Sequence, residues 1–329
     1  MLSGWCRIIV ILPQMRWSEI SVKLQICAGA TNLNHRAESD IRLACLRKNA
    51  PAWRIFMKKR WKRILSALAA FIFLSFCYAR YVEPNLLVVK EIAVETDKDM
   101  EECKIVFFTD THFGSLYDEG HAGKIADKIN ELEADIVVFG GDLFDNYTRD
   151  REMLDLEYLQ KELGRIYAKS GKYAVFGNHD YGGGASRIYR EFMEECGFCV
   201  LVNESAFLEE YGIEIVGFDD YLLGGTEPDS YLLQSENFHL IITHEPAGSK
   251  IVEGSGGNLI LSGHTHGGQV SIPYFTRKRL PAGSDQFVKG FYKEPVPVYV
   301  SSGIGLTRYP FRMFNIPEIT EIRILARNI

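Results

Sequence analysis

Short apolar runs that end in small and polar residues recur along the chain after residue 90. Five of them lead directly to histidine, aspartate or asparagine, and these are Ile105–Phe108, Ile136–Phe139, Tyr173–Phe176, Leu240–Ile242 and Leu259–Leu261. Continuous apolar runs of this length are typical of strands that are buried on both faces. We therefore predict five buried strands whose polar followers meet at one edge of a sheet.

Apolar residues at spacings of three, four and seven lie between the first runs and predict helices that pack against a sheet. The three stripes are Ile125, Ile129 and Leu132; Leu156, Leu159, Leu163, Ile166 and Tyr167; and Ile188, Phe192 and Cys196. The second half is richer in strand-like runs, namely Ile213–Phe218, His239–Ile242, Leu259–Leu261, Val296–Val300 and Ile319–Leu325. Two mixed sheets between helical layers accommodate both halves, so we predict one α/β (α+β) domain over residues 84–329.

A basic cluster followed by an uncharged apolar stretch precedes this domain. Residues 58–63 read KKRWKR, and the sixteen residues from Ile64 to Ala79 carry no charge. This order predicts a single transmembrane helix within residues 57–83, and the positive-inside rule places the following domain outside the cytoplasm. A signal peptide cleaved after Cys77-Tyr-Ala79 is the alternative. A buried core helix is disfavoured because apolar residues occupy every face of the stretch.

Residues 1–56 show mixed polarity and no sustained helical or strand periodicity. We predict that they are poorly ordered. Met57 stands at the start of a conventional basic flank, so the hypothesis that translation begins at Met57 rather than Met1 stays open. Peptides from residues 1–56 in a mass spectrum of the protein would refute it.

The composition is that of an ordinary globular protein, with 47% hydrophobic and 24% charged residues among 329. A net charge of -6 argues against a nucleic-acid binder that uses a general basic surface. Seven cysteines, an odd number, show no zinc-ribbon spacing. The single CxxC pair, Cys196 and Cys199, favours a small apolar cluster over a redox pair or disulfide.

The histidines carry the strongest chemical signal. Five of the eight, at positions 112, 179, 244, 264 and 266, stand directly after predicted strands. Asp110 and His112, like His264 and His266, are two residues apart, so on extended backbone both members of a pair would face the same way. Imidazoles and carboxylates without thiolates suit Mn²⁺, Fe or Zn²⁺ better than a structural cysteine-zinc site.

The order of motifs D-x-H, G-G-D-x-x-D, G-N-H-D, a lone H and G-H-T-H resembles the calcineurin-like metallophosphoesterases over roughly Lys90 to Leu325. The stretches GHTHGGQ (Gly263–Gln269) and SSGIGLTRYPFRMFNIPEI (Ser301–Ile319) resemble the membrane-anchored bacterial branch of that family. The resemblance implies a four-layer αββα sandwich of two mixed sheets flanked by helices, here preceded by one transmembrane helix.

Carried over residue by residue, the resemblance implies two sets of metal ligands that share one aspartate. Asp110, His112 and His266 would hold one divalent ion, Asn178, His244 and His264 would hold the other, and Asp142 would bridge them. His179 would be the acid that protonates the leaving group, and Asp145 would orient it. Some members of the family have a histidine in place of Asp145, so that role is carried over least directly.

The activity implied is hydrolysis of phosphoester or pyrophosphate bonds, phosphodiesters among them, by in-line attack of a hydroxide that bridges two Mn, Fe or Zn ions. A phosphoester substrate that is lipid-linked, with the membrane as a partner, fits the predicted anchor. One alternative is an enzyme like the UDP-2,3-diacylglucosamine pyrophosphatases, although their site faces the cytoplasm. A membrane-tethered metal-binding protein without catalysis is another. A metal-dependent amidohydrolase is disfavoured because its His-x-His pair closes the first strand.

Overall fold

The computed structural model describes residues 35–329, apart from 228–235, 253, 255, 294 and 328–329, and describes side chains from residue 56 onward. The chain divides into two compact units, Met1–Ile72 and Phe73–Ile329. Helix α2 (His35–Cys77) begins within the stretch that shows no sequence periodicity. Good helix formers such as Ala, Arg, Leu and Glu sustain a helix there without an apolar stripe. The predicted disorder of residues 1–34 lies outside the described residues.

The apolar part of α2 is long enough to cross a membrane. The candidate span is Phe56–Asn85, and an 18-residue window within it has a mean hydropathy of 1.7 with 6% of its residues buried. Exposed apolar side chains on every face are what the uncharged stretch predicts. The helix ends in a π-helical turn, η1 (Tyr78–Val82), and a 3-10 turn, η2 (Glu83–Asn85), where Pro84 stops regular helix. The boundaries of the anchor and of the domain after it stay predictions.

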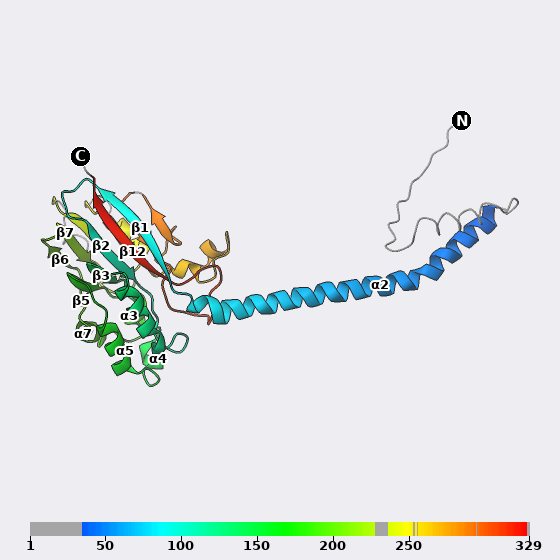
Figure 1. The fold of residues 1–329 in the computed structure, drawn as a ribbon, viewed down its shortest axis with the longest axis horizontal. Coiled ribbons are helices and arrows are strands. Elements are labelled where there is room, and N and C mark those ends of the chain that lie inside the picture. Colours follow the sequence, from blue (N-terminus) through cyan, green and yellow to red (C-terminus); the bar gives the residue numbers. More distant parts are fainter. Residues whose placement is uncertain (1–34, 228–235, 253, 255, 294, 328–329) are drawn as a thin grey trace, which may run out of the picture. The chain divides into compact units, whose positions relative to one another are not determined.

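The first sheet carries the strands that precede most of the candidate ligands (Figure 1). Its order is β1 (Val88–Thr96), β12 (Glu318–Ala326), β2 (Cys103–Phe108), β3 (Ile136–Phe139), β4 (Gly171–Ala174) and β5 (Cys199–Val200). Strands β2 to β5 are parallel, β12 is antiparallel to β2, and β1 is parallel to β12. The carboxyl ends of β2, β3 and β4 therefore lie at one edge.

The second sheet is also mixed, and two of its strands precede the remaining candidate ligands. Its order is β10 (Gly290–Tyr292), β11 (Val298–Val300), β9 (Leu259–Ser262), β8 (Phe238–Ile242), β7 (Ile213–Gly217) and β6 (Glu204–Leu208). Strands β11, β9, β8 and β7 are parallel, and the two edge strands are antiparallel to their neighbours. The loops after β8 and β9 hence leave the sheet on the same side.

Alternation along the buried strands builds two of the three core clusters. Ile105 and Phe107 of β2 face the second sheet, where they pack with Leu240 and Leu261. Val106 and Phe108, which alternate with these residues along β2, face the helices.

The α-helices after α2 are α3 (Ala122–Asn130), α4 (Tyr147–Asp150), α5 (Leu156–Gly164), α6 (Asn178–Gly182) and α7 (Tyr189–Glu195). The short 3-10 helices are η3 (Glu119–His121), η5 (Pro246–Lys250), η6 (His266–Gly268) and η7 (Thr276–Lys278).

Two mixed sheets flanked by helices confirm the predicted fold class. Four strands, β1, β5, β6 and β10, were not among the predicted runs, because they lie at or near sheet edges where polar and exposed residues interrupt the apolar pattern. Strand β4 ends at Ala174, two residues before the predicted end. Cys196 and Cys199 are both free thiols, the first buried and the second exposed.

Candidate metal centre

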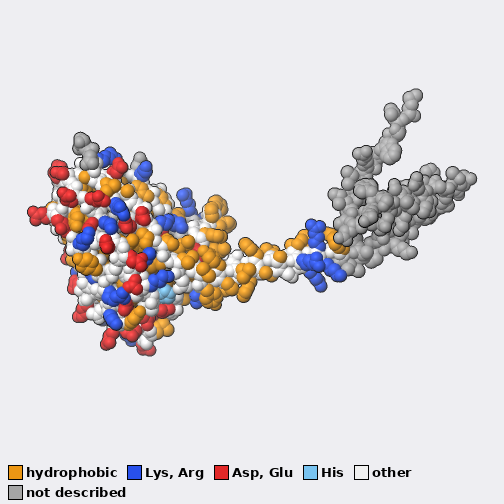
Figure 2. Space-filling model, viewed as in Figure 1, with side chains coloured by type: hydrophobic (Ala, Val, Ile, Leu, Met, Phe, Trp, Pro, Cys, Tyr) orange, Lys and Arg blue, Asp and Glu red, His pale blue; other side chains and the backbone are white. Residues whose placement is uncertain are grey.

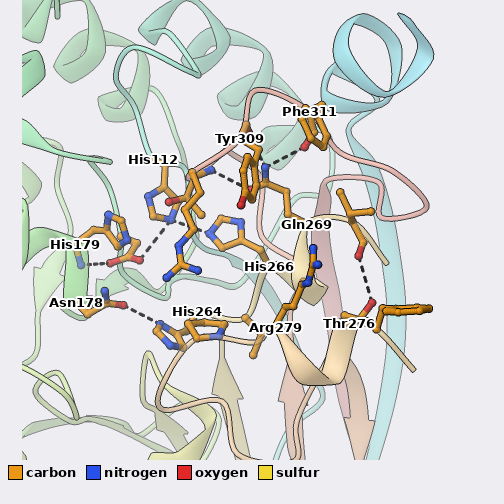
Figure 3. A pocket seen from close by; sticks show the side chains of 18 of the residues that line it. His112, Asn178, His179, His264, His266, Gln269, Thr276, Arg279, Tyr309 and Phe311 are labelled. Atoms are coloured by element: carbon orange, nitrogen blue, oxygen red, sulfur yellow. Dashed lines mark hydrogen bonds and ion pairs between the residues drawn. The ribbon is translucent and has the colours of Figure 1, made fainter. Parts of the chain in front are cut away.

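The candidate ligands meet where the parallel strands of both sheets end. Strands β2, β3 and β4 of the first sheet lead to Asp110 and His112, to Asp142, and to Asn178. Strands β8 and β9 of the second sheet lead to His244, and to His264 and His266. We refer to these seven residues as the metal-ligand cluster. Figure 3 shows the side chains of His112, Asn178, His264 and His266, which come from three loops, pointing toward one another.

The backbone of the metal-ligand cluster is unusual. The φ angles of Asp110, His112, Asp142, His264 and His266 are 56°, 46°, 58°, 67° and 49°. Residues other than glycine seldom adopt this left-handed region, and such strain gathers at functional sites. The prediction that each pair lies on extended backbone is therefore wrong. Tight turns aim these side chains, and they place His264 and His266 in different parts of the cluster.

Backbone hydrogen bonds hold the first two turns together. The N–H groups of Asp110 and His112 donate to the carbonyls of Gly141 and Asp142, at 3.0 and 3.1 Å. A Cβ on Gly177 would lie 2.3 Å from Asp142 Oδ1, so only glycine lets the third loop approach this closely. The result is that the loops after β2, β3 and β4 pack as one unit around Asp142.

One group of ligand atoms lies around Asp110, His112 and His266. His266 Nε2 is 2.8 Å from His112 Nε2 and 3.4 Å from Asp110 Oδ1. His112 Nε2 is also 3.4 Å from Asp142 Oδ2. Two imidazole nitrogens that face each other this closely need a proton or a cation between them.

A second group lies around Asp142, His244 and His264. Asp142 Oδ2 is 3.1 Å from His244 Nε2, and Asn178 Oδ1 is 2.7 Å from His264 Nδ1. The same carboxylate oxygen therefore lies between His112 of the first group and His244 of the second. All seven predicted ligand residues thus lie close to one another, and their division between two ions stays a prediction.

The ring orientations fit a bound cation. His244 Nδ1 donates to the Gly140 carbonyl at 2.7 Å, and His264 Nε2 donates to the Ala282 carbonyl at 2.6 Å. Each of these hydrogen bonds leaves the other ring nitrogen with a lone pair aimed into the cluster. His244 Nε2 is buried and has no hydrogen-bond partner among the described residues. Nitrogen and oxygen donors without thiolates are the donor set of Mn²⁺, Fe or Zn²⁺.

The electrostatics of the cluster are strongly coupled. Burial alone would raise the pKa of Asp142, but the imidazoles, His244 foremost, outweigh it and hold the pKa well below its usual range. Burial opposes charge on His112 too, yet hydrogen bonds to Asp110 and Asp145 raise its pKa to about 9. Burial and the charge of His244 lower the pKa of His264 to about 4. A divalent cation would replace the protons that neutralise the carboxylates.

His179 lies beside the cluster rather than in it. Its backbone N–H donates to Asp142 Oδ1 at 2.7 Å, and its ring Nδ1 lies 2.6 Å from the carbonyl of Asp145. The side chain is about one-third exposed, and it lines the cleft described below. The Asp145 carboxylate lies 3.6 Å from His179 Nδ1 and 3.5 Å from His112 Nδ1, so it contacts both rings.

Asp180 also supports the cluster, and the sequence reading gave it no role. Its carboxylate accepts hydrogen bonds from the N–H groups of Asp142, Leu143 and Gly177, at 2.9 to 3.0 Å. Three such bonds hold the turn that carries Asp142. Its place directly after Asn178 and His179 in the same motif was the signal available.

Arg312 is a second supporting residue that the sequence reading did not identify. It is fully buried, and its guanidinium donates to the carbonyls of Ser302 and Gly305. Its Nη2 atom lies 3.2 Å from His266 Nδ1. No feature of the local sequence pattern predicts a buried arginine.

A cleft of about 770 Å³ opens above the cluster. His112, Asp142, Asn178, His179, His264 and His266 line its inner end. Ile272, Phe275, Arg279, Arg308, Tyr309 and Phe311 line its outer end. A cleft with a convergent polar end and an apolar wall is typical of a small-molecule site.

Such a fold, with strand-end carboxylates and imidazoles arranged around a shared aspartate, defines a metal-dependent hydrolase. Comparison with known proteins agrees, because residues 103–268 match the calcineurin-like phosphoesterases. A metallophosphoesterase of Bacillus subtilis, YkuE, is 32% identical over 76% of this chain and 90% of its own length. The chain belongs to the calcineurin-like phosphoesterase family, and it is by family a metal-dependent phosphoesterase.

Two zebrafish proteins are also similar to this chain. A zebrafish protein described as a transmembrane protein with a metallophosphoesterase domain is 29% identical over 73% of this chain and 57% of its own length. The solved structure of a zebrafish dimetal phosphatase aligns with a TM-score of 0.43 and 12% identity, over 61% of this chain and 88% of that one.

Proposed function

We propose that this chain hydrolyses phosphoester or pyrophosphate bonds with two divalent ions held by the metal-ligand cluster. The observation that carries the proposal is the position of Asp142 Oδ2, which lies 3.4 Å from His112 Nε2 and 3.1 Å from His244 Nε2. One carboxylate between two sets of ligands suits a pair of ions that share it. Mn, Fe and Zn are the metals that the donor set favours.

The residues of the chain would divide the work of binding and proton transfer. Ions held in this way would polarise the phosphoryl oxygens and lower the pKa of a shared water, which then attacks in line with the leaving oxygen. The carboxylates of Asp110 and Asp142 would offset part of the positive charge of the ions. The charge that remains would attract an anionic phosphate. Asp180 keeps the Asp142 turn in place through its three backbone hydrogen bonds.

His179 is the residue we propose as the general acid. Its Nδ1 faces the Asp145 carbonyl, so the opposite nitrogen is left to donate a proton into the cleft. The hydrogen bond from the His179 backbone N–H to Asp142 Oδ1 would hold the ring close to the reacting phosphate. The chemistry supports this role because a leaving oxygen of high pKa needs a proton as its bond breaks.

We further propose that α2 anchors the enzyme in a membrane, with the domain after it outside the cytoplasm. The exposed apolar span supports the anchor, and Trp61 and Tyr81 flank its uncharged stretch, Ile64 to Ala79, as interfacial aromatics do. The basic residues 58–63 before the span support the orientation. Fusion of a reporter active on only one side of the membrane tests it.

Metal reconstitution of the full-length chain in detergent tests the proposed activity. The protein is stripped with a chelator, reloaded with Mn²⁺, and assayed on phosphodiesters, monoesters and nucleotide-diphosphate lipids. We expect turnover to return only with metal. Two bound ions without turnover on any of these substrates would favour the alternative of a metal-binding protein without catalysis.

A further inference from the structure

The outer end of the cleft exposes aromatic side chains that the proposed chemistry does not use. They lie in residues 272–279 and 307–316, which we call the rim. The aromatics of the rim that reach solvent are Tyr274, Phe275, Tyr309 and Phe314. Tyr274 and Phe314 are 69% and 65% exposed, more than most apolar side chains of the domain. A cluster of this kind marks a surface that meets an apolar partner.

The backbone of the rim keeps these side chains outward. Tyr274 and Phe314 have φ angles of 70° and 59°, a region that bulky residues rarely occupy. Gln269, which is buried, holds the second half of the rim by donating to the carbonyls of Tyr309 and Phe311 at 2.6 and 2.9 Å. Strained backbone held by buried hydrogen bonds indicates a built surface rather than a loose loop.

The rim is tied directly to the end of the apolar helix. The N–H of Arg312 donates to the carbonyl of Ala79 at 3.0 Å, and the rings of Phe311 and Phe76 lie 6.3 Å apart. The Asn315 N–H donates to the Glu83 carboxylate at 2.5 Å. Ala79 is the last residue of the uncharged stretch. The rim therefore lies level with the end of the span.

The charges of the rim are all positive. Arg277, Lys278, Arg279 and Arg308 are exposed within its two segments, and the rim contains neither aspartate nor glutamate. The chain as a whole carries a net charge of -6, so the rim departs from its surroundings. Aromatic residues interleaved with lysine and arginine are typical of protein surfaces that contact anionic lipid headgroups.

We infer that the rim docks on the anionic bilayer that α2 crosses, so that the cleft opens at the level of the lipid headgroups. Figure 2 shows hydrophobic side chains gathered on the domain around the point where the helix joins it. In Figure 3, Tyr309 and Phe311 lie at the end of the cleft near that helix, away from His179 and Asn178.

The position of the rim also defines a substrate class, and this step rests on the proposed function. Where the rim lines the cleft, Ile272, Phe275 and Phe311 form an apolar wall, with Arg279 and Arg308 beside it. An amphiphile in the bilayer would place its phosphoester on the cluster and its first methylenes along this wall. The substrate is then a membrane-embedded phosphoester or pyrophosphate rather than a soluble one.

Photo-crosslinking of the full-length chain tests the docking without any assay of activity. A benzophenone amino acid is placed at Tyr274 or Phe314, and in a matched control at Tyr167, which is 66% exposed. The proteins are reconstituted in nanodiscs of phosphatidylcholine with phosphatidylglycerol. We expect lipid adducts at 274 and 314 at a yield several-fold above that at 167.

Two results would overturn the docking. One is an adduct yield at 274 and 314 no higher than at 167. The other is crosslinking of these positions in cells to a protein partner in place of lipid. Reversal of charge by R277E with K278E should lower the adduct yield in nanodiscs that contain phosphatidylglycerol, and not in phosphatidylcholine alone.

A paired assay separates the substrate class from the proposed function. Tyr274→Asn and Phe314→Asn remove the aromatic rings yet suit the left-handed backbone, which Asn tolerates. Turnover of soluble bis(p-nitrophenyl) phosphate should stay unchanged, and turnover of a long-chain phosphodiester in nanodiscs should fall several-fold. Equal loss on both substrates, or on neither, would refute the substrate class. No turnover of either substrate by the metal-loaded wild type would instead refute the proposed function.

Discussion

The two ends of the cleft differ in how their side chains are held. In the metal-ligand cluster, hydrogen bonds hold the buried rings, as the bond to the Gly140 carbonyl holds His244. In the rim, Tyr274 and Phe314 are mostly exposed. The bonds at the inner end fix the ring orientations and leave nitrogens such as His244 Nε2 for a cation. The outer end is free to meet a second surface.

This contrast separates chemistry from substrate presentation. Changes in the cluster should affect the turnover of every substrate, because they act on the reacting phosphate. Changes in the rim should act mainly on substrates that come from a membrane. Four substitutions test the distinction between chemistry and substrate presentation, and they follow in order of expected effect.

Asp142→Asn should cause the largest loss. It removes the charge that lies between the two sets of ligands, and we expect activity to fall by more than the roughly 10²–10⁴-fold that loss of a general acid costs. Metal content, measured by mass spectrometry, should fall with activity. Asp155→Asn is the matched control, because Asp155 caps α5 and Asn caps a helix equally well. Two retained ions would contradict the bridging role.

His179→Asn should keep both ions and lower turnover by roughly 10²–10⁴-fold with a poor leaving group. The loss should shrink with a nitrophenolate leaving group, which needs no proton. His121→Asn is the control, since His121 contacts Asp118 and Asn85 and no residue of the cluster. Unchanged turnover with the poor leaving group would remove His179 from the mechanism.

Asp180→Asn should weaken metal binding by about 10–100-fold, as loss of a residue that supports a ligand does. An amide cannot accept all three backbone N–H bonds without turning its own N–H₂ toward a donor. Isothermal titration with Mn²⁺ after chelation measures the change. Affinity equal to wild type would show that the Asp142 turn does not depend on Asp180.

Arg279→Gln should have the smallest effect on a soluble substrate. Exposed charges contribute up to about 1 kcal/mol, so we expect KM to rise by less than about fivefold and kcat to stay constant. The KM for a long-chain phosphodiester in nanodiscs should rise further. A large fall in kcat on the soluble substrate would show that Arg279 takes part in the chemical step. It would contradict the separation of the metal-ligand cluster from the rim.

The sequence predicted the inner end well and the outer end poorly, for physical reasons. The ends of parallel strands converge at one edge of a sheet, so Asp110 and Asp142 of the first sheet could be brought together without coordinates, and so could His244 and His264 of the second. Their tight turns could not be foreseen, because left-handed φ at histidine and aspartate has no local sequence signal. Asp180 and Arg312 act through contacts distant along the chain.

The sequence pattern did not predict the rim either. Its two segments, 272–279 and 307–316, lie far apart in sequence and have no helical or strand periodicity. Only hydrogen bonds such as those of Gln269 and Arg312 bring them together beside the helix. Edge strands such as β6 were missed for a related reason, because their polar residues hide the pattern.

The most direct test of the account is the number and position of bound ions. The full-length chain, loaded with Mn²⁺, would be analysed by elemental mass spectrometry and by anomalous diffraction at the manganese edge. We predict two ions per chain, one near Asp110, His112 and His266, the other near Asn178, His244 and His264, with Asp142 between them. A single ion, or two ions that do not share Asp142, would contradict the account.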